Sequence, residues 1–420
     1  MNWLFAGSFS TFPPMKMSAR FALVLLTVCF TFTSLAADTS ARAGMDPARL
    51  KEIPARLQKF VDEDTIAGAV TLVARQGETA SLETVGFADL ATHKPMRADS
   101  LFWIASMTKP ITATAVLMLQ DQGKLSIDDP VEKHLPEFKN QWLVQEKSAN
   151  SVTLVRPARP ITLRDLLTHT SGLGDVPSPR PNATLAELVM AYSQQPLRFP
   201  PGSKWEYSNA GINTLGRIVE MVSGQKYAEF LQKRLLGPLG MKDTTFWPNA
   251  SQARRIAKSY QPSTDGRGLE ETDIFFLKGL PLTDRTRTPY PAGGLFSTAQ
   301  DMGRFYQMIL NGGEWRGQRL ISREATGMMT RTQTGDIKTG FVDGMSFGLG
   351  FAVVKEPRGV TSVLSAGTFG HGGAYGTQSW ADPKKDLLLV LMIQRAKLPN
   401  ADGSEVRRAF QEAAVAAIRD

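Results

Sequence analysis

The sequence predicts an α+β fold, in which helices flank an antiparallel sheet and a mostly helical domain is inserted into the sheet domain. Segments typical of strands lie near both ends of the 420-residue chain, and segments typical of helices fill most of the region between them. A short turn joins the first two strands, which indicates antiparallel pairing. We therefore expect a discontinuous sheet domain of residues 45–105 and 340–420 around a helical insertion of residues 106–339.

The sheet domain begins with a helix and a hairpin. Residues 46–62 carry apolar side chains at the spacing of an amphipathic helix. Residues 67–74 and 81–87 are typical of two strands around the turn Gln76-Gly77-Glu78. These segments supply the N-terminal part of the predicted sheet.

Helical patterns dominate the insertion. Residues 111–120 are apolar and rich in helix formers, and Gly123 is a stop signal. Thr162 is the expected N-cap of a short helix over residues 163–168. Further helices are expected over residues 212–222 and 227–236 and from Thr298, where Asp301 would complete a capping box.

Strand patterns return near the C-terminus. The expected strands cover residues 349–354, 376–381 and 387–393. Residues 382–386 predict the turn between the last two strands. An amphipathic segment, residues 405–418, is expected to end the chain as a helix.

An export signal is expected over residues 1–36, although residues 1–14 do not fit its pattern, which makes Met15 and Met17 alternative starts. A positively charged segment precedes the apolar residues 21–32, and Ser34-Leu35-Ala36 forms a small-residue cleavage site. Cleavage there predicts an exported mature protein, periplasmic or extracellular, with no membrane span. An uncleaved membrane anchor and lipid attachment at Cys29 are the alternatives.

The composition argues against several classes of function. The net charge is +8, but the basic residues are scattered and are not interleaved with aromatic ones, which argues against nucleic-acid binding. The chain has one cysteine, four histidines and no H-E-x-x-H motif, so a zinc site is not expected. We expect no metal and no cofactor.

Ser106 and Lys109 form an S-x-x-K pair at the start of a predicted helix. Residues three apart share a helix face, so the Ser106 hydroxyl and the Lys109 amine can meet. A serine hydroxyl is a weak nucleophile until a neighbour takes its proton, which a lysine of lowered pKa can do. The Ser106 N–H lies in the first turn, where it can point at a developing oxyanion. Taken alone, such a pair also arises by chance on protein surfaces.

Tyr207-Ser208-Asn209 directly precedes another predicted helix. A tyrosine near a lysine can lose its proton more easily and can pass one to a leaving group. Asn209 could orient Lys109 or bind a substrate carbonyl. The alternative is a turn in which Tyr207 contributes only packing.

His371-Gly372-Gly373 precedes the strand expected over residues 376–381. Glycines at a strand edge allow a substrate or another backbone to approach closely. The Ala374 N–H is then the candidate second donor of an oxyanion hole, together with that of Ser106. A simple glycine turn is the alternative.

In combination, the three elements resemble the serine β-lactamase and penicillin-binding-protein superfamily. Its members carry S-x-x-K at a helix start, Y-x-N in the helical domain and K-T-G on a strand. Residues 161–173 (ITLRDLLTHTSGL) and 292–298 (AGGLFST) look like the class C β-lactamase branch and its esterase relatives. The resemblance covers residues 46–420 and implies that superfamily's fold.

The resemblance implies a mechanism in which Ser106 forms an acyl-enzyme. Lys109 and Tyr207 would share the role of base, and Tyr207 would protonate the leaving group and later activate water. Asn209, His371, Gly372 and Gly373 would bind the substrate, a small ester or amide.

The third motif departs from the family pattern. His371 stands where β-lactamases and D,D-peptidases have a lysine that helps to bind a substrate carboxylate. A histidine is mostly uncharged at neutral pH. This favours the carboxylesterase branch, family VIII, over a β-lactamase or a D-Ala-D-Ala carboxypeptidase. D-aminopeptidase-type amide hydrolysis stays open, as does a non-catalytic scaffold or sensor.

Two other candidate residues are expected not to be catalytic. Ser346 lies in a G-x-S-x-G pattern of the α/β-hydrolase type, but glycine-rich sequence and a strand follow it where that motif needs a helix. His169 is expected to cap or pack the end of its helix.

Two long stretches, residues 139–160 and 261–291, have no regular pattern and are predicted to be loops of the kind that line binding sites. Phe275, Phe276 and Leu277 lie in the second stretch. They could form an acyl or alcohol pocket, and ordinary packing explains them equally well.

Overall fold

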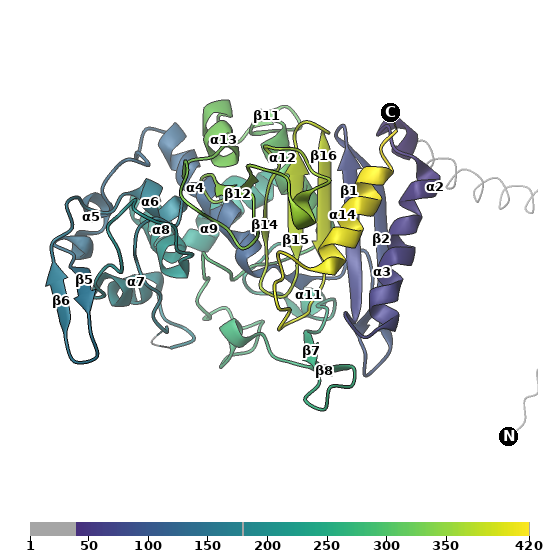
Figure 1. Cartoon of the computed structure of the whole chain (residues 1–420), viewed down its shortest axis with the longest axis horizontal. Coiled ribbons are helices and arrows are strands. Elements are labelled where there is room, and N and C mark those ends of the chain that lie inside the picture. Colours follow the sequence, from purple (N-terminus) through teal and green to yellow (C-terminus); the bar gives the residue numbers. More distant parts are fainter. Residues whose placement is uncertain (1–38, 179, 420) are drawn as a thin grey trace, which may run out of the picture.

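The computed structural model describes residues 39–178 and 180–419 (Figure 1). The predicted export signal, residues 1–36, and Cys29 therefore lie outside the described residues. The centre of the molecule is an antiparallel sheet of eight strands in the order β12-β13-β14-β15-β16-β1-β2-β3. Strands from the two ends of the chain share this sheet, and helices flank it, so the predicted fold class is confirmed.

The first strand in the sequence pairs with the last one in the interior of the sheet. Its N-terminal strands are β1 (Gly68–Arg75), β2 (Glu78–Asp89) and β3 (Lys94–Pro95). Its C-terminal strands are β12 (Met345–Phe347), β13 (Ala352–Val354), β14 (Phe369–Gly372), β15 (Gln378–Asp382) and β16 (Leu387–Met392). β1 runs antiparallel to β16, with Val70 opposite Met392.

Alternate side chains of β1 enter two cores, one on each face of the sheet. Ala69 and Val73 belong to the core that includes residues of α3 (Glu52–Asp62) and α14 (Glu405–Ala416), two helices that pack against each other. Val70 and Leu72 belong to the larger core on the other face, which includes residues of α12 (Ala299–Leu310). Figure 1 shows α14 next to α3, beside the purple and yellow strands.

The larger core continues from the sheet into the helical region. The helices there are α4 (Thr108–Asp121), α6 (Leu163–Leu167), α7 (Leu185–Ser193), α8 (Asn209–Ser223) and α9 (Tyr227–Leu231). α8 packs against the other four. The first twelve residues of α4 are buried, as expected for a helix in the middle of a core. The division into two domains stays a prediction, because one apolar cluster includes residues of both.

The remaining elements are short. They are α2 (Pro47–Leu50), β4 (Phe102–Trp103), the 3-10 helix η1 (Ala105–Met107), α5 (Val131–His134), η2 (Pro136–Phe138), η3 (Gln232–Leu236), α10 (Gly237–Leu239), α11 (Ala250–Ala253), β9 (Phe296–Ser297), β10 (Glu314–Trp315), β11 (Gln318–Arg319), α13 (Arg323–Thr330) and η5 (Gly359–Thr361).

Both predicted long loops contain short hairpins. The first holds β5 (Leu143–Lys147) and β6 (Val152–Val155), and the second holds β7 (Tyr260–Pro262), β8 (Leu269–Glu271) and the 3-10 helix η4 (Phe275–Leu277). Each hairpin is a separate two-stranded sheet. β5 and β6 are largely exposed, so they lack the apolar alternation by which a strand is recognised in a sequence.

Two local predictions need correction. The strand expected from residue 349 begins at Ala352, because Gly350 has a left-handed backbone with φ of +79°. Thr298 caps α12 by accepting from the Asp301 N–H, as predicted. However, the predicted capping box does not form. The Asp301 carboxylate instead accepts from the Asp243 N–H and the Thr244 hydroxyl, which belong to a neighbouring segment.

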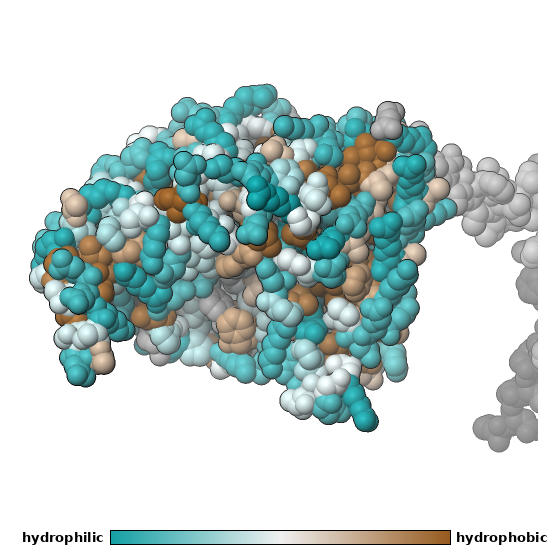
Figure 2. Space-filling model, viewed as in Figure 1, coloured by the Kyte–Doolittle hydropathy of each residue, from teal (hydrophilic) through white to brown (hydrophobic). Residues whose placement is uncertain are grey.

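The face of the molecule in Figure 2 is mostly hydrophilic, with apolar residues in separate patches. In the described part of the chain, no helix combines the length and the apolar character that crossing a membrane would need. Two exposed large apolar side chains are Phe275 and Phe341, 61% and 48% exposed respectively.

Candidate active site

A strained turn delivers Ser106 to the start of α4. The pairing of β4 with β9 fixes the approach, and the Ile104 N–H donates to the Leu295 carbonyl at 3.0 Å. Ala105 then has φ of +45°, a left-handed conformation that costs energy for any residue with a Cβ. Ser106 follows in the first turn of η1 and is partly exposed, whereas both of its neighbours are buried. The turn therefore leaves the Ser106 hydroxyl partly exposed at the edge of the buried core.

Lys109 is held by three oxygen atoms. Its Nζ lies 3.1 Å from the Ser106 Oγ, 2.8 Å from the Asn209 Oδ1 and 2.7 Å from the Ala292 carbonyl oxygen. Burial lowers the pKa of Lys109 to about 7, although the Asp175 carboxylate acts in the opposite direction. In its neutral form the amine can donate to Asn209 and Ala292 and turn its lone pair to the Ser106 hydroxyl.

Asp175 fixes the orientation of Asn209. The Asn209 Nδ2 donates to the Asp175 Oδ2 at 3.1 Å, so the amide oxygen is the atom left facing Lys109. The other Asp175 oxygen accepts from the Ala210 N–H at the N-terminus of α8, where a negative charge is favourable. The sequence analysis missed Asp175, because no pattern relates it to Y-x-N or S-x-x-K.

The Tyr207 ring packs against the Lys109 amine. The Lys109 Nζ is 4.6 Å from the ring centroid, and the His169 ring lies 4.6 Å from it on centroids. Burial raises the pKa of the Tyr207 phenol, and a hydrogen bond with the Ser106 side chain only partly opposes this. The expectation that a nearby lysine makes Tyr207 easier to deprotonate is therefore wrong, because burial dominates the pKa of its phenol. Tyr207 is a neutral phenol that is hydrogen-bonded to the nucleophile candidate.

His371 is buried and uncharged. It lies inside β14, where its Nδ1 is 2.7 Å from the Gly372 carbonyl oxygen. Burial and the Lys109 charge lower its pKa to about 3, so the imidazole is neutral at physiological pH, as predicted. The bond to Gly372 requires the proton on Nδ1, which leaves Nε2 as an acceptor. The sequence placed this motif before a strand, whereas His371 and Gly372 belong to a strand of their own.

The glycines of the third motif allow two backbones to meet. A Cβ on Gly373 would lie 2.7 Å from the Ile104 carbonyl oxygen and 2.1 Å from the Thr377 Oγ1. The backbone of the third motif thus passes directly beside the turn that carries Ser106. Ala374 is exposed in the turn that follows. The two N–H groups predicted to form an oxyanion hole therefore lie on segments that touch, and their catalytic role stays a prediction.

The two residues predicted to be non-catalytic have structural partners. His169 follows the C-cap of α6 with φ of +60°, and its Nδ1 accepts from the Ser208 N–H at 3.2 Å. It packs the end of its helix, as predicted, and also supports the Tyr207 ring. Ser346 lies in β12, where its hydroxyl bonds to Thr332 and, at 3.0 Å, to the Thr334 hydroxyl. No strand–helix turn presents Ser346, which confirms that it lacks the setting of an α/β-hydrolase nucleophile.

Two aromatic side chains frame the site. The Phe275 ring packs edge-on against Trp103 at 6.2 Å and contacts Tyr375, the residue after Ala374. The Phe341 ring lies 5.1 Å from the Tyr207 ring. Of the predicted apolar pocket, Phe275 is exposed at the site, whereas Leu277 is a core residue and the Phe276 side chain lies outside the description. Phe341 was not predicted, because it is a single aromatic residue among turns.

Within residues 39–178 and 180–419, no three histidine, cysteine or acidic side chains come together as a possible metal site. The side chains that the structure brings together at the site are a hydroxyl, a buried amine, a phenol, an amide and a neutral imidazole.

The fold and this set of groups define a serine hydrolase of the β-lactamase type. The chain belongs to the beta-lactamase family, whose model matches residues 53–414. Esterase EstB of Burkholderia gladioli is 31% identical over 84% of this chain and 94% of its own length. Protein Rv1367c of Mycobacterium tuberculosis is 34% identical over 81% of this chain and 88% of its own. The solved structure of EstCE1, a hydrolase with promiscuous acyltransferase activity, has a TM-score of 0.71 at 24% identity and covers 92% of this chain and 100% of its own.

Proposed function

We propose that this protein is a carboxylesterase that hydrolyses small uncharged esters through an acyl-enzyme on Ser106. The observation that carries the proposal is the buried, neutral His371 in the third motif. A lysine at this position would offer a positive charge to a substrate carboxylate, and a neutral imidazole does not. The similarity to an esterase, EstB, supports the same choice.

In the first step, neutral Lys109 accepts the proton of the Ser106 hydroxyl as Oγ attacks the ester carbonyl carbon. The 3.1 Å contact between the two groups permits this transfer. The oxyanion that forms is stabilised by the N–H groups of Ser106 and Ala374. The proton then passes through the Tyr207 phenol to the leaving alkoxide, the C–O bond breaks, and the acyl-enzyme remains.

In the second step, water attacks the acyl-enzyme along the reverse route. Lys109 takes a proton from the water through the Tyr207 phenol. As the bond between the Ser106 Oγ and the acyl carbon breaks, Lys109 returns this proton to the Oγ, which releases the acid and restores the Ser106 hydroxyl. Lys109 is the base of this scheme, because its pKa of about 7 lies near neutrality whereas that of Tyr207 is raised. Tyr207 relays protons as a neutral phenol.

Asn209 and the glycines of the third motif are the proposed contacts for the ester itself. The Asn209 amide donates to the Asp175 carboxylate and lies next to Lys109. Phe341 lies on the Tyr207 side of the site, which the leaving alcohol must approach in order to be protonated. The alcohol is therefore expected to contact Phe341, and an apolar alcohol suits this site.

Substrate preference tests the proposal directly. We expect the protein to hydrolyse p-nitrophenyl acetate or butyrate with a higher kcat/KM than either nitrocefin or a D-Ala-D-Ala peptide. The reason is that the last two substrates carry a carboxylate, for which His371 supplies no charge. Turnover of nitrocefin or the peptide far above that of every ester would replace this proposal with a β-lactamase or a peptidase.

Replacing Tyr207 by phenylalanine tests the proton relay. We expect Tyr207→Phe to lower kcat for ester hydrolysis by ~10²-fold or more, because the hydroxyl that delivers the proton is lost while the ring packing stays. Tyr192→Phe is the matched control, since its hydroxyl accepts from Asn213 behind the site. Unchanged turnover in Tyr207→Phe would rule out the relay.

Export to the periplasm or the extracellular space also belongs to the proposal. It rests on the charged and apolar pattern of residues 1–36. The proposed partner of the mature protein is a small-molecule ester.

A further inference from the structure

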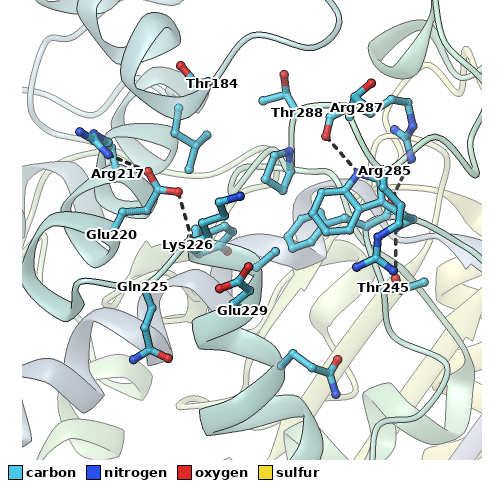
Figure 3. A pocket seen from close by; sticks show the side chains of 18 of the residues that line it. Thr184, Arg217, Glu220, Gln225, Lys226, Glu229, Thr245, Arg285, Arg287 and Thr288 are labelled. Carbon is cyan, nitrogen blue, oxygen red and sulfur yellow. Dashed lines mark hydrogen bonds and ion pairs between the residues drawn. The ribbon is translucent and has the colours of Figure 1, made fainter.

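A second cleft lies along the C-terminal half of α8, whereas Asn209, which contacts Lys109, is at the N-terminus of this helix. Its volume is about 1480 Å³, and its walls come from α7, α8, α9 and the segments 244–247 and 285–289. None of the groups assigned to ester hydrolysis lines it. Figure 3 shows Arg217 and Glu220 on one side, Arg285 and Arg287 on the other, and Lys226 between them. The cleft is larger than the sites that usually hold small ligands.

Positive charge predominates in the cleft. Its lining includes five cationic side chains, Arg217, Lys226, Lys233, Arg285 and Arg287, and two acidic ones, Glu220 and Glu229. Glu220 is already engaged, since it pairs with Arg217 at 2.9 Å and accepts from the Tyr227 N–H. The charge that remains favours an anionic ligand.

Arg287 is a buried guanidinium in the lining of the cleft. Its side chain is 3% exposed, and its Nη2 donates to the carbonyl oxygens of Phe246 and Leu282. Its Nε has no hydrogen-bond partner, and no carboxylate of the described chain forms an ion pair with it. Burial lowers the pKa of Arg287, and the nearby Asp284 carboxylate opposes this only in part. A buried charge that is not fully compensated is costly, and a bound anion would offset that cost.

Aromatic side chains line the cleft beside these charges: the Trp247 ring is partly exposed, and the Tyr227 and Phe246 rings are buried. Tyr227, Phe246 and Trp247 form a continuous series, with neighbouring ring centroids 5.7 Å and 5.8 Å apart. The Arg285 guanidinium carbon lies 5.6 Å from the Trp247 ring centroid. A ligand with an apolar body and an anionic group would match both parts of the lining.

The wall of the cleft is connected to the catalytic lysine. The segment that carries Arg287 continues to Pro291 and Ala292, whose carbonyl oxygens accept from the Thr112 hydroxyl and from the Lys109 Nζ, both at 2.7 Å. Tyr227 also lines the cleft, and its buried hydroxyl lies 2.6 Å from the same Thr112 hydroxyl. A ligand that shifts either wall would therefore move a group that holds Lys109.

We propose that this cleft is a second binding site, for an organic anion with an aromatic or similar apolar body, and that its occupation changes turnover at Ser106. The binding half of the proposal is independent of the reaction. The turnover half rests on the proposed ester hydrolysis.

The fluorescent probe 8-anilinonaphthalene-1-sulfonate tests binding to the full chain. We expect the double variant Lys226→Glu/Arg285→Glu to raise its Kd at least tenfold, which is about 1.4 kcal/mol, because two attractive charges become repulsive. Arg316→Glu is the matched control, since Arg316 also stacks on a tryptophan, Trp315 at 5.5 Å, but lies outside the cleft. The uncharged relative N-phenyl-1-naphthylamine should bind more weakly than the sulfonate.

Equal Kd values in the double variant, the control and the unaltered protein would overturn the site. Equal affinity of the charged and uncharged probes would overturn the assignment to an anion. For the turnover half, saturating sulfonate should change kcat for p-nitrophenyl butyrate by twofold or more in the unaltered protein and not in the double variant. An unchanged kcat at full occupation would overturn the coupling, whereas absence of any ester turnover would contradict the proposed function and leave the binding result standing.

Discussion

Replacing Ser106 by alanine is expected to lower kcat/KM for p-nitrophenyl esters by about 10⁴-fold or more. The nucleophile of an acyl-enzyme mechanism has no substitute, and the remaining groups can only polarise the substrate and assist water. The measurement is steady-state hydrolysis, together with labelling of the protein by a fluorophosphonate probe. The probe should label the unaltered protein at Ser106 and leave Ser106→Ala unlabelled.

Ser346→Ala is the control for this variant. Ser346 lies in the G-x-S-x-G pattern, but its hydroxyl bonds to two threonine side chains inside the fold, so the variant should retain most activity. If Ser346→Ala lost activity and labelling and Ser106→Ala kept both, the nucleophile would be Ser346. A protein that neither labels nor turns over any ester would be the non-catalytic scaffold.

Replacing Lys109 by alanine is expected to lower kcat/KM by ~10³-fold or more, because no other group in contact with Ser106 has a pKa near neutrality. In the unaltered protein, kcat/KM should rise as the pH increases and reach half its maximum near pH 7. Activity rises with pH because protonation of Lys109 below its pKa of about 7 removes the lone pair that accepts the serine proton.

Two further variants test whether Lys109 acts as the general base or has only an electrostatic or structural role. Lys109→Arg keeps a positive charge that cannot be removed at accessible pH, so it should be as inactive as Lys109→Ala. Lys124→Ala, an exposed lysine just beyond α4, should leave both the rate and the pH profile unchanged. Activity in Lys109→Arg with the same pH profile as the unaltered protein would assign the base to another group.

The sequence predicted the architecture better than the boundaries of the elements. The hairpin of β1 and β2, the capped helix α6 and the final helix α14 carry strong local patterns, namely apolar alternation, a capping residue and helical spacing. β14 was missed, because its four residues, Phe369–Gly372, include two glycines and a histidine and have no strand signature of their own. Pairing with β15, which is a tertiary contact, makes this segment a strand.

The sequence also identified the candidate reacting groups, which the structure brings together, but not the groups that hold them in place. Ser106 and Lys109 are close in the chain, and the family resemblance pointed to Tyr207 and Asn209. Asp175 and the Ala292 carbonyl could not be assigned their contacts, because they reach Asn209 and Lys109 only after α4 and α8 pack together. The direction of the Tyr207 pKa could not be predicted either, since burial in the folded protein dominates it.

The pairing of β1 with β16 has a consequence for how the chain is made. β1 leaves the ribosome early, but one of its two neighbours in the sheet is among the last segments to be synthesised. Until then one edge of β1 is unpaired and can pair with another chain, and contacts between such distant segments form slowly. The Asp46 N–H and the Ala417 carbonyl, 2.7 Å apart, join the two ends of the described fold, so a nascent chain that stops before β16 cannot complete either face of its core.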